Sequence, residues 1–339
     1  MATNQPEQNA PLIALVGPTA VGKTAVGIAL CARINGEIVS ADAVAVYRGL
    51  DIGAAKPDAS ERAQTAFHLI NVADPDEDFT LADFERQANE AIADIRRRGK
   101  TPILVGGTGL YVRSVTATLT VPHVPPQPEL RAELWAQVEQ HGSAFLHARL
   151  HAVDPASGAK ILPGDAKRII RALEVYEITG QPMSAFHTPE GVRGIPKPNT
   201  CIFGLNINRQ LLYERIEKRV DAMMAGGFLD EVRGLLGAGY GPELKSLQSL
   251  GYRHLAAYLC GETTLEAAIE TLKRDTRRYA KRQISWFNAD SQVFWLDTGT
   301  LNVAYESQES ETAFLPGSLS QAEATADAVL RYLPEHCGQ

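Results

Sequence analysis

The sequence predicts an α/β fold, with a parallel sheet flanked by helices and interrupted by an inserted all-helical domain. Short apolar runs alternate with helical patterns before residue 121 and again after residue 199, and two segments rich in proline and glycine bracket a helical stretch between them. The 339 residues suffice for two domains at roughly 100–200 residues each. A content of 45% apolar and 22% charged residues excludes a disordered chain and a disulfide-dense miniprotein.

The first strands and helices are predicted from local runs and caps. Three apolar runs have the length of buried strands, at residues 12–16, 37–40 and 102–105. Helical patterns lie between them, at residues 23–33 and 80–98. The second of these helices begins at Thr80, an N-cap with Asp83 three residues later. Because short links join the strands and helices, we expect a parallel sheet that binds its ligand at the carboxyl ends of the strands.

The helical insertion is predicted from its two connectors. Residues 121–128 (VPHVPPQP) and 188–198 (TPEGVRGIPKP) contain too much proline and glycine for regular structure, whereas residues 129 to about 187 are helical throughout. We therefore expect a core of residues 12–121 and 199–297, with an insertion domain at 122–198. In the second half of the core, a strand is expected at 201–205, helices at about 209–225, 227–237 and 263–288, and a last strand at 293–296.

The two ends of the chain are expected to be loosely held. Residues 1–11 are interpreted as a flexible leader, and residues 298–339 as an acidic tail with one helix near 320–332. The tail holds six acidic residues and one basic residue, so it contributes −5 to the net charge of −7 and leaves −2 for the other 297 residues. The acidic balance therefore does not argue against a nucleic-acid partner.

Targeting and metal motifs are missing from the sequence. It has no run of about 18 apolar residues, and its first residues have neither the charged nor the apolar region of a secretory signal. The four cysteines are scattered, and the eight histidines include no HExxH motif. We therefore expect the reducing cytoplasm as the compartment.

One motif indicates a phosphate-binding loop. It matches GxxxxGK[ST] and lies between an apolar run and a helical pattern. Its residues are Gly17, Pro18, Thr19, Ala20, Val21, Gly22, Lys23 and Thr24. In such a loop backbone N–H groups face the phosphates, the lysine adds a positive charge, and the Thr24 hydroxyl is a ligand for Mg²⁺. The motif predicts a sheet like that of the P-loop NTPases.

The acidic residue that would accompany this loop is Asp42. The 102–105 run ends in glycine, whereas the 37–40 run is followed by Ala41 and Asp42. A lone aspartate after a strand either faces the ligand or caps the next helix, and its position alone leaves both roles open.

Five further segments carry longer motifs in a fixed order. They are residues 40–57 (SADAVAVYRGLDIGAAKP), 106–111 (GGTGLY), 168–174 (RIIRALE), 251–253 (GYR) and 278–287 (RYAKRQISWF). Together with the phosphate loop they resemble the tRNA dimethylallyltransferases, over most of the chain. The resemblance implies transfer of a dimethylallyl group from dimethylallyl diphosphate to the exocyclic N6 amine of adenine 37 in tRNA, with Mg²⁺ present.

The same resemblance implies catalytic roles. Asp42 matches the general base, Thr108 contacts the reacting region, and Lys23 binds the diphosphate. Arg215 and Arg219 lie on a helix that sends an arginine to the diphosphate. The implied partner is the anticodon stem-loop of tRNA, and we expect the protein to be a monomer. The insertion could be a lid, a tRNA clamp or mere packing, and its proline-rich connectors favour a mobile clamp that closes on tRNA.

A larger set of residues aligns with tRNA-contacting segments of the family. With Asp42 and Thr108, it comprises Ala43, Val44, Ala45, Arg131, Lys167, Arg168, Arg171, Gln248, Gly251, Tyr252, Arg253, Lys281, Arg282, Gln283 and Trp286. The chain departs from the pattern at Ala43 to Ala45, where many members have Ser-x-Gln, and at Asn288, where many have arginine.

Basic residues repeat every four positions in the helix expected at 263–288. The two stripes are Lys273, Arg277 and Lys281, and Arg274, Arg278 and Arg282. Side by side they predict one cationic face, either a solvated surface or a set of phosphate contacts, and we favour the contacts. Trp286 and Phe287 fit core positions better than a base-stacking platform.

Two other function classes remain to be tested. A small-molecule or nucleotide kinase would use the same loop on ATP, although it would need an acid at a strand end for Mg²⁺. A non-catalytic RNA-binding protein would have no use for the loop lysine. Within the prenyl-transfer class, a free adenine nucleotide is an alternative acceptor.

Overall fold

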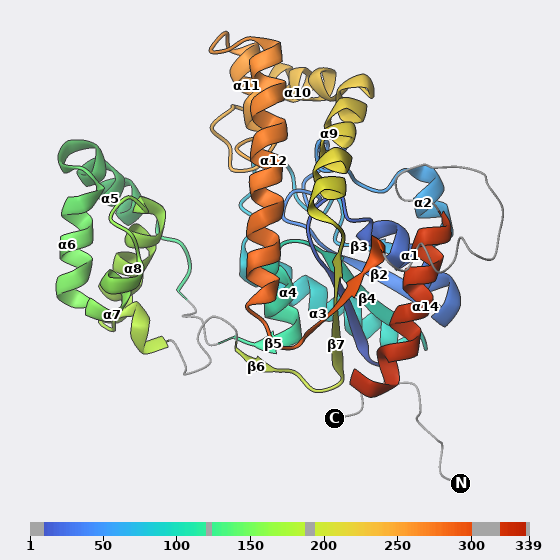
Figure 1. The fold of residues 1–339 in the computed structure, drawn as a ribbon. Helices are drawn as coiled ribbons and strands as arrows, with labels where there is room; N and C mark the ends of the chain where they lie inside the picture. Colours follow the sequence, from blue (N-terminus) through green and yellow to red (C-terminus); the bar gives the residue numbers. More distant parts are fainter. Residues whose placement is uncertain (1–9, 120–123, 187–193, 300–318, 337–339) are drawn as a thin grey trace. The chain divides into compact units, whose positions relative to one another are not determined.

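The computed structural model describes residues 10–119, 124–186, 194–299 and 319–336 (Figure 1). The chain divides into two compact units, one of Met1–Thr116 with Pro196–Gln339 and one of Ala117–Ile195. The residue range of the smaller unit nearly matches that of the insertion expected at 122–198. Most of the expected leader, and residues 300–318 of the expected tail, lie outside the described residues.

The larger unit is built on a six-stranded parallel sheet with the strand order β3-β2-β4-β1-β7-β8 (Figure 1). The strands are β1 (Leu12–Val16), β2 (Gly36–Ala41), β3 (Phe67–His68), β4 (Thr101–Gly106), β7 (Thr200–Asn206) and β8 (Val293–Asp297). β1 is central, and its Ile13 pairs with Ile103 of β4 and Cys201 of β7. The sequence predicted every strand except β3, which is too short to form an apolar run.

Nine described helices belong to this unit. They are α1 (Lys23–Ile34), α2 (Ala59–Gln64), α3 (Leu81–Arg97), α4 (Gly109–Thr116), α9 (Arg209–Ala225), α10 (Phe228–Gly237), α11 (Tyr252–Leu259), α12 (Leu265–Asn288) and α14 (Leu319–His336). The cap expected at Thr80 is confirmed, since its side chain accepts from the Asp83 N–H while the Asp83 carboxylate accepts from the Thr80 N–H. The sequence did not predict α2, α4 or α11.

The sheet separates two apolar cores because alternate side chains of a strand point to opposite faces. From β1, Ala14 and Val16 enter the core that also contains Leu104, whereas Ile13 and Leu15 enter the core that contains Ile103. All five residues of β1 are buried, as the continuous apolar run predicted.

The last described segment packs firmly on the sheet unit. α14 lies against α1, and its Ala322, Ala326 and Val329 are buried in the same core as Leu15. Its Asp327 also forms an ion pair with Arg33 of α1 at 2.6 Å. A helix near 320–332 is thus confirmed, but this part of the tail belongs to the core and is not loosely held. Small alanine side chains allow the close approach, and they carried no strong apolar signal.

The smaller unit is helical, with a core of its own. Its helices of six residues or more are α5 (Pro128–His141), α6 (Ser143–Val153), α7 (Pro155–Lys160) and α8 (Ala166–Thr179). Short strands, β5 (Ala117–Thr118) and β6 (Ile195–Pro196), pair where the chain enters and leaves it. Leu134, Leu146 and Leu173 are almost fully buried between the helices.

No helix within the described ranges combines the length and the hydropathy that a membrane span needs.

Candidate active site

A cavity of about 830 Å³ lies at the carboxyl ends of the central strands. The loop between β1 and α1, the loops after β2 and β4, and side chains of α9 and α12 line it. Lys23, Asp42, Thr108, Arg215 and Arg219, the five residues expected to be catalytic, all line this cavity. Parallel sheets bind ligands at this edge because several loops meet there.

The predicted phosphate loop connects β1 to α1 and forms one side of the cavity. Gly17 has φ +138°, and a Cβ at this position would lie 2.4 Å from the Leu205 carbonyl oxygen, so only glycine fits. The Lys23 ammonium turns back over the loop and donates to the carbonyls of Gly17 at 3.0 Å and Pro18 at 2.7 Å. Its Nζ is therefore held against the loop by two backbone carbonyls.

The charge on Lys23 is costly in this structure. Burial and, to a lesser degree, the neighbouring Arg219 lower the pKa of Lys23 to about 7, although Asp42 acts in the opposite direction. An anion bound in the loop would raise this pKa again, because it places negative charge next to the ammonium. The site is thus arranged to receive an anion.

Thr24 begins the first turn of α1 and lines the cavity. No cluster of three or more His, Cys, Asp or Glu that would hold a metal occurs within the described residues. The donor set fits Mg²⁺ held in the manner common for phosphate sites, with one hydroxyl from the protein and the remaining ligands from phosphate oxygens and water.

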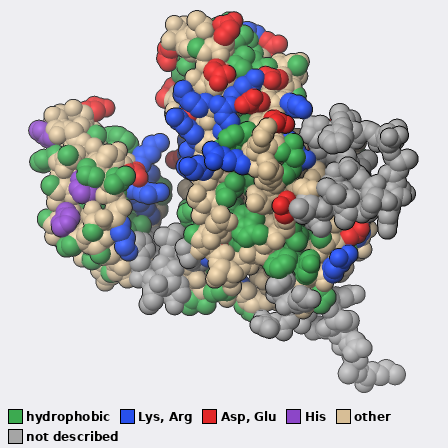
Figure 2. All heavy atoms as spheres, viewed as in Figure 1, with side chains coloured by type: hydrophobic (Ala, Val, Ile, Leu, Met, Phe, Trp, Pro, Cys, Tyr) green, Lys and Arg blue, Asp and Glu red, His purple; other side chains and the backbone are tan. Residues whose placement is uncertain are grey.

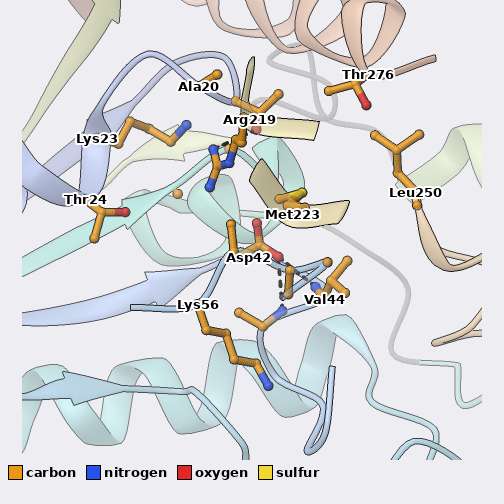
Figure 3. A pocket seen from close by; sticks show the side chains of 18 of the residues that line it. Ala20, Lys23, Thr24, Asp42, Val44, Lys56, Arg219, Met223, Leu250 and Thr276 are labelled. Carbon is orange, nitrogen blue, oxygen red and sulfur yellow. Dashed lines mark hydrogen bonds between the residues drawn. The ribbon is translucent and has the colours of Figure 1, made fainter. Parts of the chain in front are cut away.

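Two arginines of α9 face the same cavity, one turn apart. Arg219 reaches the phosphate loop, with its Nη1 3.4 Å from the Thr19 hydroxyl oxygen. Figure 3 shows its guanidinium between Lys23 and Asp42. Arg215 instead donates from Nη2 to the Gln321 side-chain oxygen at 2.8 Å. Arg219 is therefore the arginine at the loop, a distinction that their equivalent positions on the helix did not reveal.

Asp42 follows β2 and fixes a turn, and the next described helix, α2, begins only at Ala59, so the helix-cap alternative is wrong. Its Oδ1 accepts hydrogen bonds from the N–H groups of Val44 at 2.8 Å and Ala45 at 3.1 Å, which fixes a turn (Figure 3). The carboxylate also lines the cavity. The turn holds one oxygen in place, so the orientation of the other one is set by the fold.

Thr108 ties the loop after β4 to the Asp42 segment. Its hydroxyl accepts from the Ala43 N–H at 3.1 Å, and its own N–H donates to the Ala41 carbonyl at 3.2 Å. Tyr279 of α12 lines the same cavity, and burial raises the pKa of Tyr279 to about 12. Asp42 and Thr108 are thereby positioned as one unit.

Comparison with known proteins identifies the family. A family model described as IPP transferase matches residues 45–290, and one described as isopentenyl transferase matches residues 10–73. The chain belongs to the IPP transferase family. A relative named tRNA dimethylallyltransferase, from Symbiobacterium thermophilum, is 50% identical over 85% of this chain and 89% of its own length. A second relative of the same name, from Geobacter metallireducens, is 49% identical over 86% of this chain and 94% of its own length.

Solved structures of IPP transferases share the fold. The full-length tRNA isopentenylpyrophosphate transferase of Bacillus halodurans is 38% identical, with a TM-score of 0.67, over 97% of this chain and 98% of that one. A eukaryotic dimethylallyltransferase, described as acting on tRNA, is 29% identical with a TM-score of 0.72, over 88% of this chain and 76% of that one.

Gln283, expected among the tRNA contacts of the family, is buried beneath the phosphate loop. Its side-chain oxygen accepts from the Thr19 N–H at 2.8 Å, and its Nε2 donates to the Gly107 carbonyl at 3.0 Å. Both ends of the amide are therefore used to join α12 to the phosphate loop and to the loop after β4. We regard Gln283 as a positioning residue.

The basic residues of α12 separate into two groups. Lys273 and Arg277 pair with acids of α9, at 2.6 Å from Asp221 and 2.7 Å from Glu217, so they join two helices. The exposed group comprises Arg274, Arg278, Lys281 and Arg282. Figure 2 shows lysine and arginine side chains gathered over this helix. The single cationic face expected from the sequence is therefore narrower than predicted.

The remaining family positions of this unit differ in exposure. Gln248 and Arg253 are exposed, and Trp286 is 40% exposed. Phe287 is buried, as expected, but the core position expected for Trp286 is wrong, because this side chain lies at the surface near Gly109.

Two further family positions, Gly251 and Tyr252, are buried at the start of α11. The Tyr252 hydroxyl donates to Glu231 at 2.6 Å, and Gly251 lines the cavity. Ala43, Val44 and Ala45 also line it.

In the helical unit, the four expected tRNA contacts form two pairs. Arg131 and Arg171 both bind the fully buried Glu174, at 2.8 and 2.6 Å. Lys167 and Arg168 are exposed at the start of α8. Arg131 and Arg171 therefore share a structural partner that the sequence did not reveal. Lys167 and Arg168 do not pair with Glu174.

Sequence reasoning missed two residues that support the cavity wall. Glu231 of α10 accepts from the N–H groups of Asp51, Ile52 and Gly53, at 3.0, 2.7 and 3.2 Å, and so fixes a loop whose next residues line the cavity. Gln321 of α14 binds Arg215. A lone Glu or Gln on a helix carries no sequence signal, because its partners lie far away in the chain.

Proposed function

We propose that the protein transfers the dimethylallyl group of dimethylallyl diphosphate to the N6 amine of adenine 37 in tRNA, releasing diphosphate. Membership of the IPP transferase family supports tRNA dimethylallyl transfer. The observation that carries the proposal is that the phosphate loop and the Asp42 carboxylate line one cavity, 830 Å³ in volume, which has room for a small diphosphate ester and a base together.

Departure of diphosphate is the step that the loop assists. As the bond between the allylic C1 and the diphosphate oxygen breaks, negative charge grows on the diphosphate. Lys23, Arg219 and backbone N–H groups of the loop stabilise this charge, and they are held in place before the reaction starts. A bound diphosphate would give the buried Lys23 a counter-ion and so favour its ammonium form, which burial disfavours in the free protein.

Proton removal from the amine is assigned to Asp42. The N6 amine becomes acidic as its bond to C1 forms, and a carboxylate oxygen next to it then takes one N6 proton. The turn at Val44 and Ala45 holds one Asp42 oxygen, which leaves the other for the amine. Thr108, tied to the same segment, is assigned to orient the adenine.

The apolar part of the cavity suits the dimethylallyl group. Met223, Val44 and Leu250 lie on the side away from Lys23 (Figure 3). Apolar side chains exclude water from the allylic carbon, so they protect the developing cation from hydrolysis.

Mg²⁺ fits this site as a partner of the diphosphate. The Thr24 hydroxyl would hold it together with diphosphate oxygens, and the ion would supply charge neutralisation of the leaving group.

The RNA partner is proposed to be the anticodon stem-loop of tRNA, bound by a monomer in the cytoplasm. The exposed Arg278, Lys281 and Arg282 of α12 support phosphate contacts next to the cavity. To reach the Asp42 carboxylate inside the cavity, the adenine must leave its stack, which a single-stranded loop permits at low cost.

One assay tests the proposal. The protein is incubated with radiolabelled dimethylallyl diphosphate, Mg²⁺ and tRNA that lacks the modification, and the tRNA is then digested to locate the label. We expect label on adenine 37 and none in a matched tRNA with guanine at that position. If the protein transfers label from γ-labelled ATP to a small molecule, and none from dimethylallyl diphosphate, it is a kinase. If label appears only on free adenine nucleotides, those nucleotides and not tRNA are the acceptor.

A further inference from the structure

The C-terminal helix reaches the cavity wall through Gln321. This side chain is buried on α14, where its oxygen accepts from Arg215 Nη2 at 2.8 Å and its Nε2 donates to the Thr298 carbonyl at 2.8 Å. The Thr298 hydroxyl in turn donates to the carbonyl of Asn206, the last residue of β7, at 3.0 Å. A continuous set of hydrogen bonds thus joins Arg215 to the sheet.

Arg215 is a cation without an acidic partner within the described part of the chain. None of the ion pairs formed there includes it, and its buried Nε has no hydrogen-bond partner there. Its neighbour one turn later, Arg219, contacts the phosphate loop, and both side chains line the cavity. A half-buried guanidinium held by a neutral amide keeps its full charge available to an anion, whereas a carboxylate partner would compete with that anion.

The support for Gln321 does not depend on Arg215. Ala322, Ala326 and Val329 anchor α14 in the core beside α1, and Asp327 pairs with Arg33 at 2.6 Å. The helix therefore presents Gln321 from a fixed position.

We propose that Gln321 is a positioning residue that holds Arg215 as a second diphosphate-binding arginine, so that the C-terminal helix contributes to the donor site. Lys23, Arg219 and Arg215 would then surround one diphosphate from the phosphate loop and from α9. The inference takes only the identity of the ligand, an organic diphosphate, from the proposed function. The same three cations should also bind inorganic diphosphate.

The test measures binding of inorganic diphosphate with Mg²⁺ to the full chain by calorimetry, without tRNA. Gln321→Met keeps the shape of the side chain but removes both amide groups, and we expect it to weaken diphosphate binding by about five- to tenfold, as for one missing hydrogen bond to a charged group. Asp327→Asn, on the same helix, breaks only the surface ion pair and should leave the dissociation constant unchanged.

A double-mutant cycle separates positioning from general destabilisation. Arg215→Ala should weaken diphosphate binding at least as much as Gln321→Met, and the double variant should be no weaker than Arg215→Ala alone, because both changes remove the same interaction. In steady-state assays the KM for dimethylallyl diphosphate should rise while the KM for tRNA stays constant.

Unchanged diphosphate affinity in Gln321→Met, or additive effects in the double variant, would overturn the inference. If Gln321→Met unfolds, Gln321→Asn, which keeps an amide but shortens its reach, gives the same comparison. The outcome is independent of the transfer assay. A protein that binds diphosphate through Arg215 but does not prenylate tRNA would refute the proposed function and keep the inference.

Discussion

Binding of the prenyl donor should be coupled to proton uptake by Lys23. In the free protein, burial and Arg219 bring the pKa of Lys23 to about 7, so at pH 8 only about one-tenth of the molecules carry the ammonium. A bound diphosphate supplies negative charge and raises this pKa well above 8. Binding should therefore take up about 0.9 proton at pH 8 but only about 0.1 at pH 6, where Lys23 is already charged.

The assay is calorimetric titration with dimethylallyl diphosphate in buffers that differ in ionisation enthalpy, since the slope of the observed enthalpy against that quantity gives the number of protons. The sign follows from linkage: donor affinity should be independent of pH below the free pKa and fall about tenfold per pH unit above it. Lys23→Arg, which stays charged, controls for protons taken up by the ligand itself. An uptake at pH 8 equal in wild type and Lys23→Arg would refute the argument.

Three other changes test the support around the cavity. Gln283→Leu removes the bonds to the phosphate loop and to the loop after β4, and should weaken diphosphate binding about tenfold while tRNA affinity changes little, as measured by calorimetry and filter binding. Charge reversal at Lys281 and Arg282 should lower the slope of log affinity for tRNA against log salt by about 1 for each phosphate that the protein no longer neutralises, and an unchanged slope would remove α12 from the RNA surface. Glu231→Gln should lower the free energy of unfolding by about 1–3 kcal/mol in urea titrations, because the charged acceptor of three backbone N–H groups is removed, and an unaltered midpoint would count against this anchoring role.

Much of the sheet unit follows from local features of the sequence. Buried parallel strands are apolar throughout, so runs such as residues 12–16 and 201–205 are recognised without any knowledge of their partners. The phosphate loop is also local, because glycines, lysine and threonine at fixed spacing carry its function. The position of Asp42 after a strand left a ligand-facing and a capping role open, and the resemblance of its flanking residues to the family favoured the first.

The remaining features depend on contacts between distant segments. Arg215 and Arg219 lie on one helix face, and only Gln321, more than a hundred positions away, separates their roles. Gln283 belongs to a basic motif that resembles tRNA-contacting segments. It nevertheless lies on the buried side of α12, so its side chain points to the phosphate loop. Arg131 is drawn to a buried acid in the same way. Sequence spacing identifies a helix face, but the partner across that face comes only from the tertiary structure.

In the proposed reaction, Asp42 removes a proton from adenine in a cavity where the phosphate loop holds the donor. Its most direct test is single-turnover transfer of label from dimethylallyl diphosphate to tRNA by wild type and Asp42→Asn. We expect the transfer rate to fall by about 10²–10⁴-fold, the usual contribution of a general base, while the dissociation constant for tRNA stays within about twofold. Transfer at a rate near that of wild type would contradict the assignment of Asp42 and the account of the site.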